Sequence, residues 1–296
     1  MTPRKIALSA LVAAGLAGAA ALLFWLQRPA EPSRPLAKLR AADLTRIELD
    51  YNGAHVALEM RAGTWRLTAP VQDDADDGAA DGLAQSLRGL ALGSEVSREP
   101  SGYADYEVNE SSAARVRVYC RTSAAPVLDG YFGKTAMADS VYFRPSREAA
   151  VYLAEGVRSY ALRQGAEELR SKAVVSLSVA DLQSLKFAGL GGFTLTSSSG
   201  SWLAAGRTLS ADQAAELVLS ATSLRFMSFA AADTPAGKAG FDKPAVDFTA
   251  GGAGRSERVL IGREEAGRRY AKAERGAVGF VSKSDVDSLL KLLKRR

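Results

Sequence analysis

The chain has 296 residues, of which 47% are hydrophobic and 24% charged, and its formal net charge is +5. This composition is typical of a globular protein with room for two domains, and it excludes an intrinsically disordered chain. The positive charge is spread along the sequence rather than clustered, so the sequence predicts no nucleic-acid partner.

A stretch without any charged residue, Ile6–Leu26, lies close to the N-terminus. As a helix it would be about 32 Å long, enough to cross the roughly 30 Å hydrocarbon core of a bilayer. Arg4 and Lys5 precede it, and Trp25 lies where an interfacial anchor is common. The positive-inside rule then leaves residues 1–5 in the cytoplasm and the rest of the chain in the periplasm, anchored in the inner membrane. A cleaved signal peptide is the alternative, but its apolar region is normally shorter and ends in small residues.

The segment that follows, residues 27–39, is rich in proline and charge, which predicts a semi-rigid spacer. Beyond it the same landmarks occur twice. Two triplets recur 137–138 positions later: Ala42-Asp43-Leu44 as Ala180-Asp181-Leu182, and Gly63-Thr64-Trp65 as Gly200-Ser201-Trp202. The sequence therefore predicts two copies of one module, residues 40–172 and 173–296.

Each copy is expected to begin with a strand pair and a third strand that carries a tryptophan, Trp65 or Trp202. In the first copy, Asn52-Gly53 between two alternating runs is typical of a hairpin turn. A helix should follow in each copy, because Asp76 and Ser210 suit the N-cap position and leucines recur after them at helical spacing.

More short strands close each copy, and Gly133 and Gly262 are expected at equivalent strand ends. A terminal helix should follow, over Val157–Ser171 in the first copy and Asp285–Lys294 in the second. This order describes an α+β module with a largely antiparallel sheet. The predicted fold is therefore α+β, with an N-terminal transmembrane helix and two tandem repeats of a mainly antiparallel sheet with packed helices.

Several short motifs also occur in a characteristic order. They are Gly63-Thr64-Trp65-Arg66-Leu67 with Pro70, then Asp76, Tyr106, Gly133, Tyr142 and Leu169-Arg170-Ser171-Lys172, with Gly240-Phe241-Asp242-Lys243-Pro244 in the second copy. With the membrane helix, they resemble the bacterial family catalogued as domain of unknown function 4340. Ser171 stands where the family pattern has aspartate. The resemblance implies an envelope protein, in some members an auxiliary component encoded with gliding-type ABC transport systems, and it implies no catalytic residue.

Three arginines of one predicted strand form the candidate partner-binding surface. In Ala114–Thr122, apolar residues alternate with Arg115, Arg117 and Arg121, so these three should share the solvent face. Such a face could receive an anionic partner, and a solvated sheet face without a ligand is the alternative. Cys120, the only cysteine, should lie on the opposite, buried face as an inert thiol.

The sequence predicts no catalytic residue, no cofactor and no metal site. One histidine, His55, and one cysteine are too few ligands for zinc. The acidic run Asp73–Asp77 lacks two ligands of a calcium loop, because Ala75 and Ala84 stand at ligand positions. It is better explained as complementing a helix N-terminus. We therefore expect a non-enzymatic binding or assembly protein, with an accessory role in an ABC-type transport system suggested by the resemblance alone. The alternative is an envelope hydrolase that acts on a glycan or peptide.

Overall fold

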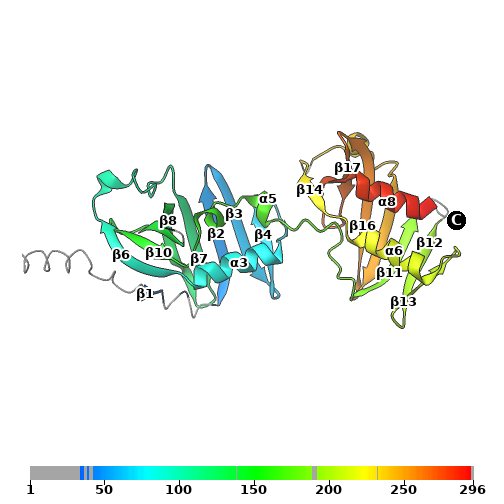
Figure 1. Cartoon of the computed structure of the whole chain (residues 1–296), viewed down its shortest axis with the longest axis horizontal. Coiled ribbons are helices and arrows are strands. Elements are labelled where there is room, and N and C mark those ends of the chain that lie inside the picture. The colour runs from blue at the N-terminus through cyan, green and yellow to red at the C-terminus, as the bar shows by residue number, and fades with distance from the viewer. Residues whose placement is uncertain are drawn as a thin grey trace, which may run out of the picture. The chain divides into compact units, whose positions relative to one another are not determined.

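The computed structural model describes residues 34–36, 39, 43–137, 139–188, 192–231 and 233–294. These residues form two mostly antiparallel sheets with few helices, as the sequence predicted (Figure 1). The expected transmembrane helix Ile6–Leu26 lies outside the described residues. Among the residues that are described, no helix has both the length and the apolar character needed to cross a membrane.

The chain divides into two compact units. One comprises Met1–Gly53 with Leu83–Arg163, and the other comprises Ala54–Gly82 with Gln164–Arg296. Strands of the first sheet therefore occur in both units, whereas the second sheet lies wholly in the second unit. The module limits expected from the sequence, 40–172 and 173–296, stay a prediction.

The first sheet contains ten strands in the order β1-β6-β10-β9-β8-β7-β2-β3-β4-β5. The strands are β1 (Arg34–Pro35), β2 (Leu44–Tyr51), β3 (Ala54–Arg61), β4 (Thr64–Ala69), β5 (Asp73–Asp74), β6 (Ala91–Ser97), β7 (Ala114–Cys120), β8 (Ser123–Met137), β9 (Ser140–Pro145) and β10 (Val151–Glu155). The accompanying helices are α3 (Asp77–Arg88), a 3-10 turn at Pro100–Gly102, α4 (Ser159–Leu162) and α5 (Ala166–Leu169).

The second sheet contains eight strands in the order β13-β12-β11-β15-β16-β17-β18-β14. The strands are β11 (Leu182–Ala188), β12 (Phe193–Ser198), β13 (Ser201–Ala205), β14 (Phe226–Phe229), β15 (Val246–Gly252), β16 (Arg255–Glu265), β17 (Arg268–Lys272) and β18 (Val278–Ser282). The helices are α6 (Ala211–Thr222), α7 (Ala236–Ala239) and α8 (Lys283–Lys294). If the two-residue strands β1 and β5 are left aside, both sheets connect their strands in the same order.

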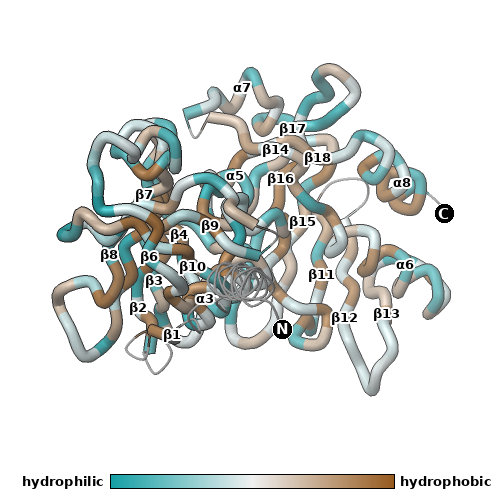
Figure 2. Tube along the Cα trace, turned by 60° about the vertical axis from the view of Figure 1, so that its left-hand side comes forward, coloured by the Kyte–Doolittle hydropathy of each residue, from teal (hydrophilic) through white to brown (hydrophobic). Residues whose placement is uncertain are grey.

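The core of the second sheet is covered by two amphipathic helices. Leu217 of α6 and Leu289 and Leu293 of α8 are buried in one hydrophobic cluster with Phe248 of β15. Figure 2 shows hydrophobic and hydrophilic residues together on α8, as expected for a helix that buries one face. Full burial of each such side chain contributes about 1.5–3 kcal/mol, so these contacts hold the helices on the sheet.

The alternation expected in the arginine strand is confirmed in β7. Every second residue from Ala114 to Cys120 is buried, and Arg115 and Arg117 on the other face are partly exposed. The Cys120 thiol lies on the buried side of the strand.

Three sequence expectations differ from the structure. The single helix expected over Val157–Ser171 is wrong, because Gly165 adopts an extended conformation and separates the single turns α4 and α5. Strands β6 and β14 were not expected, and each follows a helix. The end of the expected spacer, Arg34–Pro35, forms β1 and pairs with β6, where an edge strand tolerates proline.

A β-bulge lies at the same place in both sheets. From Phe132 to Thr135, β8 advances three residues while β9 advances two. From Ile261 to Glu264, β16 likewise advances three residues while β17 advances two. Gly133 and Gly262 therefore lie in bulges inside their strands, rather than at strand ends.

The two glycines are needed because a backbone carbonyl packs directly against each bulge, from the loop before β7 in the first sheet and from the end of α7 in the second. A Cβ on Gly133 would overlap the carbonyl oxygen of Tyr106, and a Cβ on Gly262 would overlap that of Ala239. The strand backbone and the preceding segment thus approach more closely than any side chain would allow.

We expect Gly262→Ala to lower the free energy of unfolding by about 1–3 kcal/mol, because the added methyl group has no space. Gly82→Ala is the matched control, since Gly82 lies exposed in α3 and a Cβ there would meet no atom within 4 Å. It should stabilise the protein by up to about 1 kcal/mol through helix propensity. Urea unfolding followed by circular dichroism measures the free energy of unfolding of both variants. Equal changes in the two variants would contradict the close packing at Gly262.

Candidate functional site

The bulge in β8 presents one backbone carbonyl to two side chains of the following segment. The Gly133 carbonyl oxygen accepts a hydrogen bond from Arg163 Nη2 at 3.2 Å and a long one from Ser159 Oγ at 3.4 Å. The end of β8 is thereby linked to α4 and to Arg163. Bulges commonly re-aim groups beside binding sites, and here the bulge orders one wall of a pocket.

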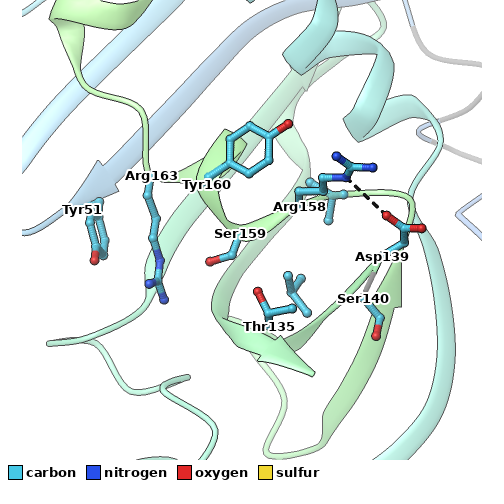
Figure 3. Close-up of a pocket in the computed structure, with 10 residues that line it drawn as sticks. Tyr51, Thr135, Asp139, Ser140, Arg158, Ser159, Tyr160 and Arg163 are labelled. Carbon is cyan, nitrogen blue, oxygen red and sulfur yellow. Dashed lines mark hydrogen bonds and ion pairs between the residues drawn. The ribbon is translucent and has the colours of Figure 1, made fainter. Parts of the chain in front are cut away.

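We refer to this cavity as the Gly133 pocket. Its volume is about 870 Å³, and it lies within the first unit (Figure 3). The residues that line it are Tyr51, Thr135, Asp139, Ser140, Val141, Val157, Arg158, Ser159, Tyr160 and Arg163. They come from the ends of β2, β8 and β9 and from α4 with its flanks, so the pocket joins segments that are distant in the sequence.

Arg163 and Tyr51 form one side of the Gly133 pocket. The Arg163 guanidinium lies over the Tyr51 ring, 5.0 Å from its centroid, and Nη2 also donates to Glu107 Oε2 at 3.0 Å. The Arg163 side chain is therefore held in place by an ion pair, a cation–π contact and a hydrogen bond to the bulge carbonyl. In Figure 3, Tyr51 and Arg163 lie side by side, apart from Arg158 and Asp139.

The opposite side is more open. Arg158 Nε donates to Asp139 Oδ1 at 3.2 Å, with both side chains more than half exposed. The Tyr160 side chain is 67% exposed. Ser140 is buried, and among the described residues its hydroxyl has no hydrogen-bond partner. The Gly133 pocket thus combines fixed and adjustable polar groups with aromatic rings.

A second, smaller pocket lies beside the other bulge. Its volume is about 460 Å³, and its lining includes Gly262, Asp242, Glu264 and Arg269. Arg269 Nη1 donates to the Gly262 carbonyl oxygen at 3.3 Å. A guanidinium therefore contacts the bulge carbonyl in both sheets. Among the described residues that line this second pocket, none is aromatic or carries a hydroxyl group.

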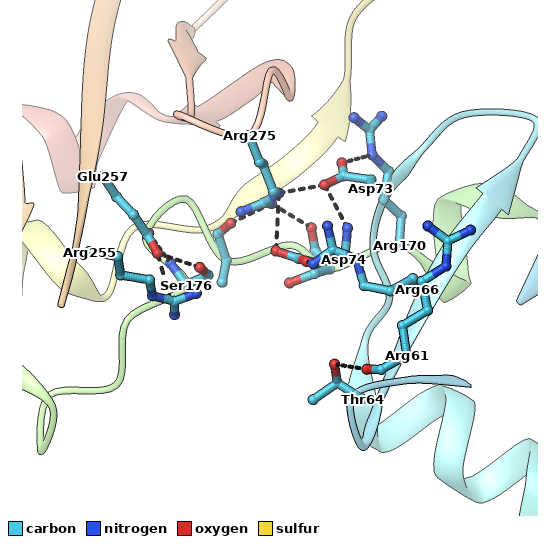
Figure 4. Close-up of polar contacts among 12 residues, drawn as sticks. Arg61, Thr64, Arg66, Asp73, Asp74, Arg170, Ser176, Arg255, Glu257 and Arg275 are labelled. Carbon is cyan, nitrogen blue, oxygen red and sulfur yellow. Dashed lines mark hydrogen bonds and ion pairs between the residues drawn. The ribbon is translucent and has the colours of Figure 1, made fainter. Parts of the chain in front are cut away.

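The acidic run Asp73–Asp77 has a structural role in the second unit. Asp73 is buried, and its carboxylate pairs with Arg170 Nε at 2.5 Å and with Arg275 Nε at 2.6 Å (Figure 4). Arg275 Nη2 also donates to the carbonyl oxygens of Ser171 and Ala173, at 3.1 and 2.7 Å. The calcium-loop alternative does not match this arrangement, because two guanidiniums occupy the Asp73 oxygens.

Arg115 and Arg117 of β7, and Arg121 directly after its end, pair with carboxylates of neighbouring segments. The pairs are Arg115 with Asp129, Arg117 with Glu48 and Asp50, and Arg121 with Asp43. These acids lower the net charge of the face. Its binding of an anionic partner stays a prediction.

The remaining residues singled out in the sequence lie in the scaffold. Trp65 is buried and donates from Nε1 to Asp81 Oδ1 at 3.0 Å, whereas Trp202 is partly buried against the core of the second sheet. Asp76 Oδ1 accepts from the Ala79 amide at 3.0 Å at the start of α3. Ser210 caps α6 in a capping box with Gln213.

The sequence analysis missed the lining of the Gly133 pocket. Ser159, Tyr160 and Arg163 lie within the helix expected over Val157–Ser171, where the helical spacing that places them on one face gives no sign of a cavity. Gly165 was a usable signal, because glycine inside a helical pattern often marks a boundary. The meeting of Tyr51 with these residues depends on tertiary structure and had no local signal.

Comparison with known proteins gives one match. The family model described as "Domain of unknown function (DUF4340)" matches residues 65–244, which is more than half of the chain. A search of curated proteins and a search of solved structures each gave no match.

We expect Asp73→Ala to cost about 3–5 kcal/mol of stability, because it leaves two largely buried guanidiniums without their shared carboxylate. Arg61→Ala is the matched control, since the Arg61–Glu59 pair is exposed and should contribute no more than about 1 kcal/mol. Urea unfolding of both variants tests this. A loss below that of the control would show that the Asp73 cluster does not stabilise the fold.

Arg115 should control the titration of Asp129. Burial raises the pKa of Asp129, but hydrogen bonds from Arg115 and Ser146 outweigh it, so the pKa is lowered. A lowered pKa in the folded state means stability that is present above the pKa of the unfolded chain and lost as the pH falls through the folded value.

Arg115→Gln should therefore raise the pKa of Asp129 and reduce this acid-dependent part of the stability. Carboxyl ¹³C NMR titration measures the pKa directly. Arg121→Gln is the control, because Arg121 pairs with Asp43 and should leave Asp129 unchanged. An unchanged pKa in Arg115→Gln would contradict the assigned cause.

Proposed function

The chain belongs to the family of domain of unknown function 4340, and on this premise we propose that it is a membrane-anchored periplasmic protein that works by binding or assembly. In this proposal, its two sheets are tandem copies of one α+β module. The shared strand order and the matching glycine bulges support the duplication.

The observation that carries the proposal is the way in which buried charges are used. Enzymes that act by acid–base chemistry keep perturbed titratable groups in a cleft, ready for substrate. Here, Glu48 pairs with Arg117, and Asp73 pairs with two arginines. Glu257 accepts hydrogen bonds from the amide and hydroxyl of Ser176, at 2.7 and 2.5 Å.

Arg144, the other buried charge among the described residues, is also held within the fold. Its Nε donates to the Val108 carbonyl oxygen at 3.1 Å, and its guanidinium lies 4.5 and 4.2 Å from the ring centroids of Tyr103 and Tyr131. Buried charges that are paired in this way stabilise a scaffold. This use favours binding or assembly over catalysis.

The membrane anchor in this proposal is Ile6–Leu26, with residues 1–5 in the cytoplasm and the sheets in the periplasm. Its uninterrupted apolar sequence behind Arg4 and Lys5 supports this topology. The partner in the proposal is an ABC-type transport system of the gliding kind, to which the chain would be an accessory component. That partner rests on family analogy.

An alkaline phosphatase fusion after residue 40 should be active, because this enzyme forms its disulfides only outside the cytoplasm. A β-galactosidase fusion at the same position is the reciprocal control and should be inactive. The opposite pair of results would overturn the topology.

The partner is tested separately. The full chain, purified by affinity from detergent extracts, should recover subunits of a transport system above a control that carries only residues 1–40. Mass spectrometry identifies the recovered proteins. Recovery of no such subunit above the control would contradict the transport role and leave the topology result standing.

A further inference from the structure

We propose that the Gly133 pocket binds an acidic saccharide, a sugar unit that carries a carboxylate. The inference deepens the proposed function, since it rests on the pocket facing the periplasm. Three features of the lining carry it: aromatic rings, an array of hydrogen-bonding groups, and an excess of guanidinium over carboxylate.

The aromatic rings match the apolar face of a sugar. Tyr160 lines the cavity and is 67% exposed to solvent, and Tyr51 lies on another side beneath the Arg163 guanidinium. A pyranose ring has C–H groups on its faces and hydroxyls around its edge. Tyrosine suits such a ligand, because its ring is apolar and its hydroxyl can bond to polar groups at the same time.

The polar groups match the edge of a sugar. Sugar hydroxyls both donate and accept, and the hydroxyls of Ser159 and Thr135 have the same capacity. Arg163 is placed to donate, because its hydrogen bonds to Glu107 and Gly133 both use Nη2. Its Nε and Nη1 groups make no hydrogen bond to the described residues and remain available to a ligand.

The charges of the lining favour an acid. Among the residues that line the cavity, two carry guanidiniums, Arg158 and Arg163, and one carries a carboxylate, Asp139. Arg163 is also paired with Glu107, so Arg158 is the guanidinium that a ligand acid would engage. The Arg158–Asp139 contact is a single hydrogen bond of 3.2 Å between exposed groups, and such pairs are weak. The other partner of Arg158 is the exposed Tyr160 side chain, whose hydrogen bond is the main cause that raises the pKa of Arg158. Arg158 can therefore turn to a ligand carboxylate, for which a guanidinium offers a two-bond geometry.

The size of the cavity and the contrast with the second pocket agree with this assignment. A volume of about 870 Å³ lies in the range of small-molecule sites and can accept more than one sugar ring. The pocket beside Gly262 has the equivalent bulge carbonyl and guanidinium, but its described lining has no aromatic ring or hydroxyl group. The features that recognise a sugar occur only in the first of these two pockets.

Two sugars provide a matched test. N-acetylmuramic acid carries a lactyl ether with a carboxylate, and N-acetylglucosamine has the same ring without it. In saturation-transfer NMR titrations of the full chain in detergent, we expect the acid to bind at least about tenfold more tightly, because it adds a charge-assisted hydrogen bond.

Variants identify the groups. Arg158→Gln should remove the preference for the acid, and Arg98→Gln, which breaks an exposed arginine–glutamate pair outside the pocket, should keep it. Tyr160→Ala should weaken the binding of both sugars, and Tyr160→Phe should preserve it, because the face of the ring makes the contact. The three substituted positions are exposed on the protein surface, and circular dichroism checks that the variants fold.

Equal binding of the two sugars, or the same loss in Arg98→Gln as in Arg158→Gln, would overturn the carboxylate assignment. No binding of either sugar would overturn the saccharide site itself. The fusion and purification experiments do not depend on sugar binding. Failure of the saccharide site is therefore distinguishable from failure of the proposed function.

Discussion

The carbonyl oxygen of Tyr106 packs against the backbone of β8 at Gly133, in space that any side chain would fill. The Lys134 amide donates to the same oxygen at 3.2 Å, which fixes the loop before β7 to the sheet. The Gly133 carbonyl in turn accepts from Arg163 and Ser159. One close backbone contact therefore sets the loop, the bulge and one wall of the pocket together, and a wall built on backbone is more precise than one built on mobile side chains.

The buried ion pairs provide a second constraint. Burial of a carboxylate costs roughly several kcal/mol of hydration free energy, and only well-placed charged partners offset this cost. Asp73 has two such partners, and one of them, Arg170, belongs to the motif Leu169-Arg170-Ser171-Lys172. The Ser171 amide also donates to the Asp74 carbonyl oxygen at 2.9 Å. This motif therefore has a physical role in holding β5, and the role uses the backbone of Ser171 rather than its side chain.

The sequence predicted the elements whose signals are local. The Asn52-Gly53 hairpin, the alternation of β7 and the two 12-residue helices α3 and α6 follow from turn chemistry, period and capping. Strands β6 and β14 were missed because they are short or mixed in polarity, and their pairing with β10 and β18 joins distant segments. The pocket was missed for the same reason, since it depends on tertiary contacts and on where a helix stops.

The two bulges also separate what the sheets have in common from what distinguishes them. In each sheet a guanidinium satisfies the bulge carbonyl, but Arg163 follows α4 whereas Arg269 lies in β17. The same backbone requirement is therefore met from two different directions. When the arginine comes from outside the sheet, as Arg163 does, it brings the α4 segment with Tyr160 over the end of β8, and a cavity with an aromatic wall results. When it comes from the neighbouring strand, as Arg269 does, the described lining of the pocket beside the bulge has no aromatic ring. The position of the bulge-binding arginine in the chain thus accounts for the aromatic lining of the Gly133 pocket and for its absence from the described lining of the pocket beside Gly262.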